Sequence, residues 1–331
     1  MAPKPVPVGT NPFVPNGTVV DAGERPAAVT VNVQCGQCRA AVVVQAESAG
    51  TMRYTCPTCG ALNEFSINDK GHDKPPEATL PSYWASDRSQ GGKGLVMASE
   101  STKRAMQVLL DNTWKSQITR DRPGHEKVPK FEVIMVHRNE NLAIWDSYVR
   151  TRDKIAEECA GCETWQVKTA TETTSSPDAS ELFIQADLNE NVNEFYMFHG
   201  TKPSAARAIC DSDFLLDMAG RNAGTLYGPG LYFAEASSKS DEYAQEDKEG
   251  IFAGLYAMLV CRVACGNINY TDEVKPHVQG LVDSILTKKT HHTILGDREK
   301  ARGTYREFIV FDKDQVYPEF VIVYRRVPAE P

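Results

Sequence analysis

Two pairs of cysteines near the N-terminus constrain how this part of the chain folds. Cys35 and Cys38 form one CxxC sequence, Cys56 and Cys59 form a second, and 17 residues separate the two pairs. Two such turns can place four thiolates around one Zn²⁺, which is tetrahedral in structural sites. So small a β-unit buries too little surface to fold unaided, whereas a structural zinc supplies about 10–16 kcal/mol of folding free energy. The spacing predicts a zinc ribbon over residues 29–67, whose metal has no open position for catalysis.

A redox dithiol is the alternative interpretation of a CxxC sequence. It requires one reactive pair beside a βαβ pattern, whereas two pairs in a β-hairpin setting favour zinc. Residues 1–79 contain six Lys or Arg against seven Asp or Glu, so the ribbon lacks the basic surface of a DNA-binding module. Scaffolding, a protein contact and nucleic-acid binding therefore remain open as its purpose.

The composition bounds the class of protein. The 331 residues suggest about two domains, and 41% hydrophobic with 24% charged residues is ordinary for a globular chain with a sizeable core. A net charge of −8 argues against a strongly basic nucleic-acid binder. No stretch reaches the ~20 apolar residues of a membrane span, and the N-terminus lacks the apolar segment of a secretory signal. Six of the nine cysteines stand in CxxC sequences, which indicates a reducing compartment, so we expect an intracellular protein of nucleus or cytoplasm without a membrane partner.

Shifts in residue pattern divide the chain further. Pro- and Gly-rich residues 1–28 predict a flexible tail, and apolar-poor residues 68–98 predict a linker. Helical spacing of apolar residues predicts a helix over 101–117 within a lead-in at 99–126. Within the remaining domain, residues 127–328, we expect a buried strand over 131–137 and a second helix capped by Asn141.

Three segments of the C-terminal half combine polar groups with turns and strands. The first is FHGT at 198–201, the second is the glycine-rich run from Gly224 to Tyr243, and the third is YREFIVFD at 305–312. The second segment predicts a loop, a short strand and a helix that Ser237 or Ser238 caps. A carboxylate at the mouth of an apolar strand can stabilise positive charge, and aromatic rings can stack on a planar heterocycle. The segments therefore predict a pocket for a planar, sugar-bearing ligand.

These segments resemble the catalytic domain of the poly(ADP-ribose) polymerases, which are diphtheria-toxin-like ADP-ribosyltransferases. The His-Tyr-Glu triad of that family is matched by His199, Tyr232 and Glu307, in the same order. The resemblance covers residues 127–326 and includes FEVIMVHRNENLAIWDSY at 131–148. It implies an α+β fold of antiparallel sheets with flanking helices. It also implies transfer of ADP-ribose from NAD⁺ to protein side chains, the chain itself included, with release of nicotinamide; repetition would give a polymer.

The resemblance further implies how NAD⁺ is held. His199 would bind ribose hydroxyls, while the Gly200 backbone and the Ser240 hydroxyl would grip the nicotinamide carboxamide. Tyr232 and Tyr243 would sandwich the nicotinamide ring.

By the same resemblance, Thr201 would face the adenosine side and residues 219–228 would form a loop over the cofactor. Glu307 would bind the 2′-hydroxyl of the nicotinamide ribose and stabilise the oxocarbenium-like transition state. A positioned carboxylate fits this role because positive charge develops at the anomeric carbon as nicotinamide leaves.

Rival interpretations remain beside this one. Taken singly, His199 is compatible with a core or turn histidine, Tyr232 and Tyr243 with core aromatics, and Glu307 with a solvated charge at a strand end. A catalytically silent adaptor that binds NAD⁺ or ADP-ribose is disfavoured by the intact triad. An RNA 2′-phosphotransferase is disfavoured by the YREF sequence and the acidic net charge. Residues 101–122 are too short for the helical autoinhibitory bundle of larger family members. We therefore do not expect this chain to share their activation by DNA breaks.

Overall fold

The chain divides into two compact units, Met1–Pro76 and Glu77–Pro331. The computed structural model describes residues 29–35, 40–46, 50–67, 77–92, 94–122, 127–160, 167–171, 188–216 and 225–328. The predicted tail at 1–28, Cys38 and most of the predicted cofactor loop at 219–228 lie outside these residues. No helix of the described part is long and apolar enough to cross a membrane.

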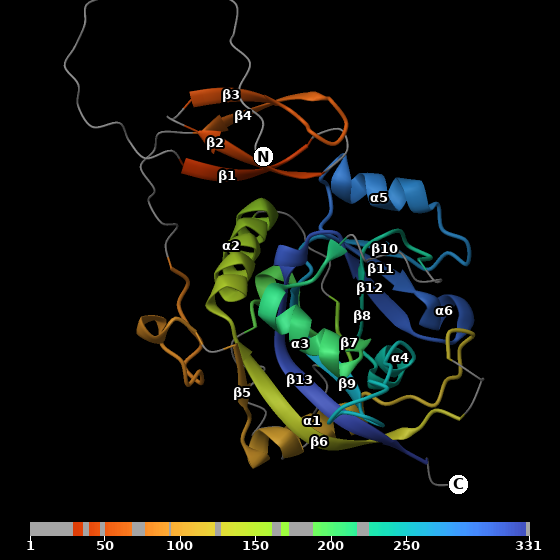
Figure 1. Cartoon of the computed structure of the whole chain (residues 1–331). Helices are drawn as coiled ribbons and strands as arrows, with labels where there is room; N and C mark the ends of the chain where they lie inside the picture. The colour runs from red at the N-terminus through yellow and green to blue at the C-terminus, as the bar shows by residue number, and fades with distance from the viewer. Residues whose placement is uncertain are drawn as a thin grey trace, which may run out of the picture. The chain divides into compact units, whose positions relative to one another are not determined.

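The first unit consists of two β-hairpins (Figure 1). β1 (Val29–Gln34) pairs with β2 (Ala41–Ala46), and β3 (Gly50–Thr55) pairs with β4 (Leu62–Ile67), both antiparallel and without a register shift. Cys35 follows β1, and the second CxxC turn joins β3 to β4. Each hairpin therefore carries its cysteines where its strands are connected.

The second unit is built on a nine-stranded sheet in the order β10-β11-β12-β8-β7-β9-β13-β6-β5. All neighbours are antiparallel except β10 and β11. The strands are β5 (Gly94–Met97), β6 (Lys130–Glu140), β7 (Glu194–Thr201), β8 (Leu231–Ala234), β9 (Tyr256–Ala264), β10 (Ile268–Thr271), β11 (Thr293–Asp297), β12 (Arg306–Val310) and β13 (Val316–Val327). This arrangement confirms the predicted α+β fold class.

The sheet is nearly divided between β7 and β8. These two strands share one pair of residues, Phe198 and Ala234, whereas β7 and β9 pair along eight residues. The strands on either side of this junction diverge, and this opening is where the candidate site lies.

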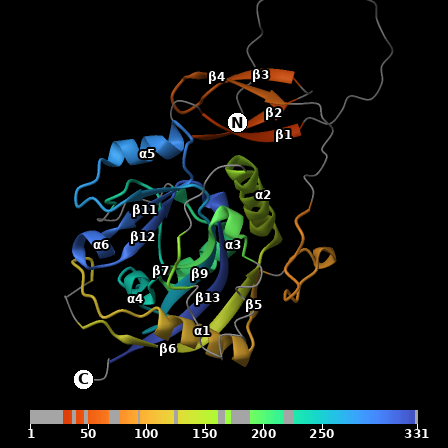
Figure 2. The same ribbon diagram turned by 180° about the vertical axis from the view of Figure 1, so that it is seen from behind.

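The central strand β9 is apolar along nearly its whole length because both faces of the sheet are buried there. In β9, Leu259, Cys261 and Val263 face the layer that contains α3 (Pro203–Ser212), and Met258 and Val260 face the layer that contains α1 (Glu100–Asn112). The two helices thus cover opposite faces (Figure 1, Figure 2). Three cysteines, Cys210, Cys261 and Cys265, are buried in the α3 layer.

The remaining helices are α2 (Leu142–Cys159), α4 (Ser237–Asp241), α5 (Val278–Leu286) and α6 (Arg298–Arg302). Asn141 caps α2 as predicted, since its side chain accepts hydrogen bonds from the backbone of Ala143 and Ile144. The strand predicted over 131–137 is β6, which is longer, and the first helix ends at Asn112 rather than at residue 117. Thr113 closes that helix by donating its hydroxyl to the Leu109 carbonyl, and the chain continues without regular secondary structure.

The prediction that Ser237 or Ser238 caps α4 is wrong. Ala236 occupies the N-cap, and both serines lie inside the helix. The Ser237 hydroxyl donates to the Leu110 carbonyl, and the Ser238 hydroxyl accepts from the Lys115 amide. The serines therefore attach α4 to the last turn of α1 and to the chain that follows it, instead of capping their own helix.

Residues 77–97, predicted as part of a linker, belong to the second unit. β5 pairs with β6 at the edge of the sheet. Trp84 is buried and packs against Tyr317 and Trp145, with ring centroids 6.0 and 5.5 Å away. Buried Glu140 accepts from the amides of Ala85 and Ser86 at 2.9 and 2.7 Å, which fixes this segment against β6.

Candidate active site

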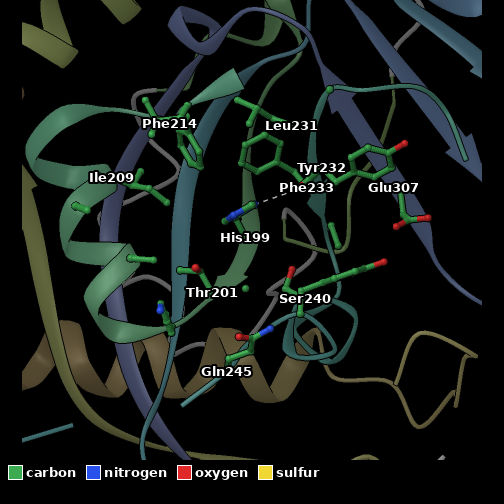
Figure 3. A pocket seen from close by; sticks show the side chains of 18 of the residues that line it. His199, Thr201, Ile209, Phe214, Leu231, Tyr232, Phe233, Ser240, Gln245 and Glu307 are labelled. Atoms are coloured by element: carbon green, nitrogen blue, oxygen red, sulfur yellow. Dashed lines mark hydrogen bonds between the residues drawn. The ribbon is translucent and has the colours of Figure 1, made fainter. Parts of the chain in front are cut away.

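A cavity of about 730 Å³ opens where β7 and β8 diverge (Figure 3). One wall is apolar and comes from α3 and the chain after it, with Ile209 and Phe214. The opposite side carries the polar groups. All seven residues predicted from the sequence to hold NAD⁺ line this one cavity: His199, Gly200, Thr201, Tyr232, Ser240, Tyr243 and Glu307. Its size and mixed lining are typical of a site for a small organic ligand.

Gly200 lets β7 approach α4 closely. A Cβ atom built on Gly200 would lie 1.8 Å from the Ser240 carbonyl oxygen, so no other residue fits there without moving the backbone. The Ser240 hydroxyl of α4 donates a hydrogen bond to the Phe198 carbonyl of β7 at 3.0 Å. This bond also holds α4 against β7. The two residues predicted to grip a carboxamide are therefore in direct contact.

His199 is fixed as a neutral imidazole. Its Nδ1 lies 3.1 Å from the Tyr232 carbonyl oxygen, which only accepts, so Nδ1 carries the proton and Nε2 remains an acceptor. The Phe214 and Phe233 rings pack around it, with centroids 5.3 and 5.6 Å away. Burial lowers the pKa of His199, so the ring stays uncharged at neutral pH.

The Tyr232 hydroxyl both donates and accepts a hydrogen bond. The hydroxyl donates to the Gly228 carbonyl at 2.9 Å and accepts from the Tyr227 amide at 3.0 Å. Burial raises the pKa of Tyr232 well above its ordinary value, so the phenol is neutral. Because its hydroxyl is occupied by the backbone, Tyr232 offers a ligand the face of its ring.

Glu307 lies on β12 beside Ala234 of β8, at the end of the larger cavity. Burial raises the pKa of Glu307 above its ordinary value, and the nearby Lys239 ammonium opposes this shift. The Lys239 Nζ lies 3.6 Å from Glu307 Oε1, which is an ion pair but too long for a hydrogen bond. Lys239 immediately precedes the predicted Ser240, yet the sequence analysis did not single it out.

A second, smaller cavity of about 240 Å³ lies on the other side of Glu307. It shares only Lys239 and Glu307 with the larger cavity. The rest of its lining comes from residues 118–121, Leu226, α6 and the two residues before β12, and it includes Arg298 and Arg302. Glu307 is thus reachable from two separate directions.

The cysteines of the first unit form a cluster that fits a metal. The Sγ atoms of Cys35, Cys56 and Cys59 all lie within 4.8 Å of one another, and those of Cys35 and Cys59 are 3.7 Å apart. Zinc–sulfur bonds of ~2.3 Å give a tetrahedron with an edge of about 3.8 Å, so this separation suits thiolates sharing one Zn²⁺. The Asn63 amide donates to Cys35 Sγ at 3.5 Å, which supports a thiolate there. Cys38, the predicted fourth ligand, lies outside the described residues.

The fold and this site together define the class. A mostly antiparallel sheet opened at one junction, with histidine, tyrosine and glutamate on adjoining strands around one cavity, is the fold of an ADP-ribosyltransferase. The family model of the poly(ADP-ribose) polymerase catalytic domain matches residues 144–326, more than half of the chain. The chain belongs to this family.

Individual relatives agree with the family. Protein mono-ADP-ribosyltransferase PARP12 of Mus musculus is 24% identical over 291 residues, which cover 84% of this chain and 32% of that protein. The Homo sapiens PARP12 is 24% identical over 257 residues, 76% of this chain and 28% of that protein. The poly [ADP-ribose] polymerase tankyrase of Caenorhabditis elegans is 27% identical over 182 residues, 45% of this chain and 8% of that protein. The chain spans about a third or less of the length of these curated relatives.

Proposed function

We propose that this chain transfers ADP-ribose from NAD⁺ to protein side chains and releases nicotinamide. One observation supports the proposal: Glu307 lines two cavities, one with the predicted nicotinamide- and ribose-binding groups and a separate, smaller one that we assign to the acceptor. A transferase needs this arrangement, because donor and acceptor must reach the reacting carbon from opposite sides.

In the proposed reaction the bond between ribose C1′ and the nicotinamide nitrogen breaks, and its electron pair leaves with neutral nicotinamide. A lone pair of the acceptor then forms the new bond to C1′, and the acceptor's proton passes to water. Glu307 accepts a hydrogen bond from the ribose 2′-hydroxyl, and its negative charge favours the cationic transition state. Neutral His199 and the Tyr232 ring hold the ribose and the base, which reduces the entropic cost of reaching this geometry.

The predicted role of Glu307 requires its ionised form. Burial and the neighbouring carboxylates raise the pKa of this group, whereas Lys239 lowers it. We therefore expect activity to fall as the pH drops through the pKa of Glu307, at a higher pH than for an exposed glutamate. His199 adds no second limb at neutral pH, because its own pKa is lowered.

For the first unit we propose a structural Zn²⁺ held by Cys35, Cys56, Cys59 and Cys38. Zinc would fix the turns that connect the strands and would supply no chemistry to the transfer, since four thiolates fill its coordination sphere. Metal analysis of the purified chain, with and without a chelator, tests the stoichiometry, for which we expect one zinc per chain.

The transfer is tested by incubating the purified chain with NAD⁺ labelled in its adenylate, with Glu307→Gln in parallel. The amide keeps the shape and removes the charge, so we expect a rate lower by ~10²–10³ with NAD⁺ binding retained. Glu132→Gln is the matched control, because this glutamate is half exposed at the surface of β6 and pairs only with Arg325 among the described residues.

A sharp labelled protein band indicates single transfer, and a ladder or smear indicates elongation to poly(ADP-ribose). Binding of NAD⁺ without label or released nicotinamide would contradict the proposal and favour a silent adaptor. Label on added RNA rather than on protein would favour the RNA 2′-phosphotransferase.

A further inference from the structure

A short segment before the family match forms part of the candidate site. Residues 115–122 follow α1, lie outside the matched residues 144–326, and pack against α4. The Lys115 amide donates to Ser238 at 3.0 Å, and the Tyr305 hydroxyl donates to the Gln117 carbonyl at 2.7 Å. Arg122 forms an ion pair with Asp241 at 2.9 Å, with both side chains buried. The segment is therefore anchored along its length, and Asp121 is held between these anchors.

The Lys239 ammonium has three N–H donors, and three partners surround it at hydrogen-bond distance. They are Asp121 Oδ2 at 3.0 Å, Glu242 Oε2 at 2.8 Å and the Tyr243 hydroxyl at 3.2 Å. Because an ammonium carries three protons, no further donor remains for Glu307, which lies at 3.6 Å. The Lys239 side chain is 4% exposed, so water does not exchange freely with these partners.

We propose that Asp121 is a positioning residue: by accepting a hydrogen bond from Lys239 it keeps this ammonium from donating to Glu307, so that the Glu307 carboxylate stays available to the ribose hydroxyl. The inference rests on the proposed function and adds a residue to its site. Without Asp121, Lys239 would have a proton to spare beside a buried carboxylate, and the hydrogen bond would form there instead.

The charges around Glu307 determine in which direction its pKa moves when Asp121 is removed. Lys239 faces it from α4, Glu242 from the residue after α4, and Asp121 from the segment, and the neutral phenols of Tyr227, Tyr232 and Tyr243 also lie nearby. Burial raises the pKa of Glu307, Lys239 lowers it, and the negative charges of Asp121 and Glu242 raise it further. Removal of Asp121 therefore lowers the pKa of Glu307, first by removing a like charge and second by freeing Lys239 to donate.

The experiment measures nicotinamide release by the full chain across pH for wild type, Asp121→Ala and Asp121→Asn. We expect kcat to fall about tenfold in Asp121→Ala, less than the ~10²–10³ for loss of a transition-state partner itself, with a much smaller change in the KM for NAD⁺. We also expect the acid limb of kcat to move to lower pH in both variants. Asp153→Asn, at an exposed site on α2, is the matched control.

A second measurement tests whether Asp121 acts through Lys239. In a Lys239→Met background, Asp121→Ala should cause little further loss, because no ammonium remains to be held back. Equal fold-losses in both backgrounds, or an acid limb that stays in place in both Asp121 variants, would overturn the inference even if the variants are less active. Thermal unfolding of each variant identifies losses due to misfolding, and Asp121→Asn keeps the size of the side chain. A wild-type chain that releases no nicotinamide would instead refute the proposed function.

Discussion

The two units of this chain bury very different amounts of apolar surface. Among the described residues of the first unit whose side chains can be placed, the buried ones are two cysteines, Cys35 and Cys56. In the second unit, layers of aliphatic and aromatic side chains cover both faces of the nine-stranded sheet. Burial contributes roughly 25 cal/mol per Å² of apolar surface, so packing alone can account for the stability of the sheet, whereas the described side chains of the hairpins offer little burial. The proposed zinc at the clustered thiols would supply the stability that the first unit gains little of from packing.

Removal of the proposed metal should give the largest difference in stability between the two units. Cys56→Ser, or treatment with a strong chelator, would remove the proposed zinc, and structural zinc contributes about 10–16 kcal/mol of folding free energy. We expect amide hydrogens of β1–β4 to lose all protection from exchange, while those of β7, β9 and β13 keep theirs. Hydrogen exchange resolved by peptide measures both in one sample.

Cys210→Ser should have the opposite effect and destabilise the second unit alone. This thiol is buried in the apolar layer under α3, so a serine hydroxyl there should cost about 1–3 kcal/mol of stability in the second unit and leave zinc content unchanged. Loss of protection in both units after either substitution would show that they do not fold independently.

A buried ion pair should matter within the second unit even though its core is large. In Arg122→Met, Asp241 loses a partner at 2.9 Å and keeps Arg326 and the Tyr324 hydroxyl. We expect a loss of about 3 kcal/mol, measured by denaturant unfolding, because a carboxylate with no exposure is left undercompensated.

Arg325→Ala is the comparison for this pair. Arg325 and Glu132 pair at 3.0 Å with both side chains more than half exposed, so the loss should stay below ~1 kcal/mol. Equal losses at the two sites would mean that burial does not set the value of ion pairs in this unit.

The smallest expected effect is on stability, and it comes from the burial of the ionised Glu307 carboxylate. Burial raises the pKa of Glu307 in the folded chain, so its ionised form destabilises the fold. This cost is fully present above the folded pKa and disappears as the pH falls below the unfolded value. Glu307→Gln should therefore be more stable than wild type at neutral pH, by about 0.5–2 kcal/mol, a common gain when an active-site constraint is removed.

Melting temperatures of wild type and Glu307→Gln across pH measure this gain. The difference should shrink toward zero in acid. A difference that is independent of pH would mean that the charge of Glu307 carries no stability cost.

The sequence predicted the parts of the fold that local patterns encode. Strand β6 follows from its largely apolar stretch at 131–137, the cap of α2 follows from the chemistry of Asn141, and the resemblance brought together seven residues that line one cavity. Trp84 was missed because a single buried aromatic in an apolar-poor stretch has no period, although it packs on Tyr317. Asp121 was missed for a related reason. Asp121 accepts a hydrogen bond from Lys239, which is 118 positions away in the sequence. No local pattern distinguishes a polar loop residue that makes such a distant contact.

The position of β13 has a consequence for synthesis of the chain. This strand is the last of the sheet to be made, yet it lies inside the sheet, with β9 on one side and β6 on the other. Until it has emerged, β6 and β5 have no strand through which to join the half that carries His199, and β9 has an open edge. A nascent chain therefore passes through a long interval with unpaired strand edges, in which association with other chains competes with folding. The proposed transfer would therefore begin only after β13 is in place, and a chain truncated before this strand should release no nicotinamide from NAD⁺.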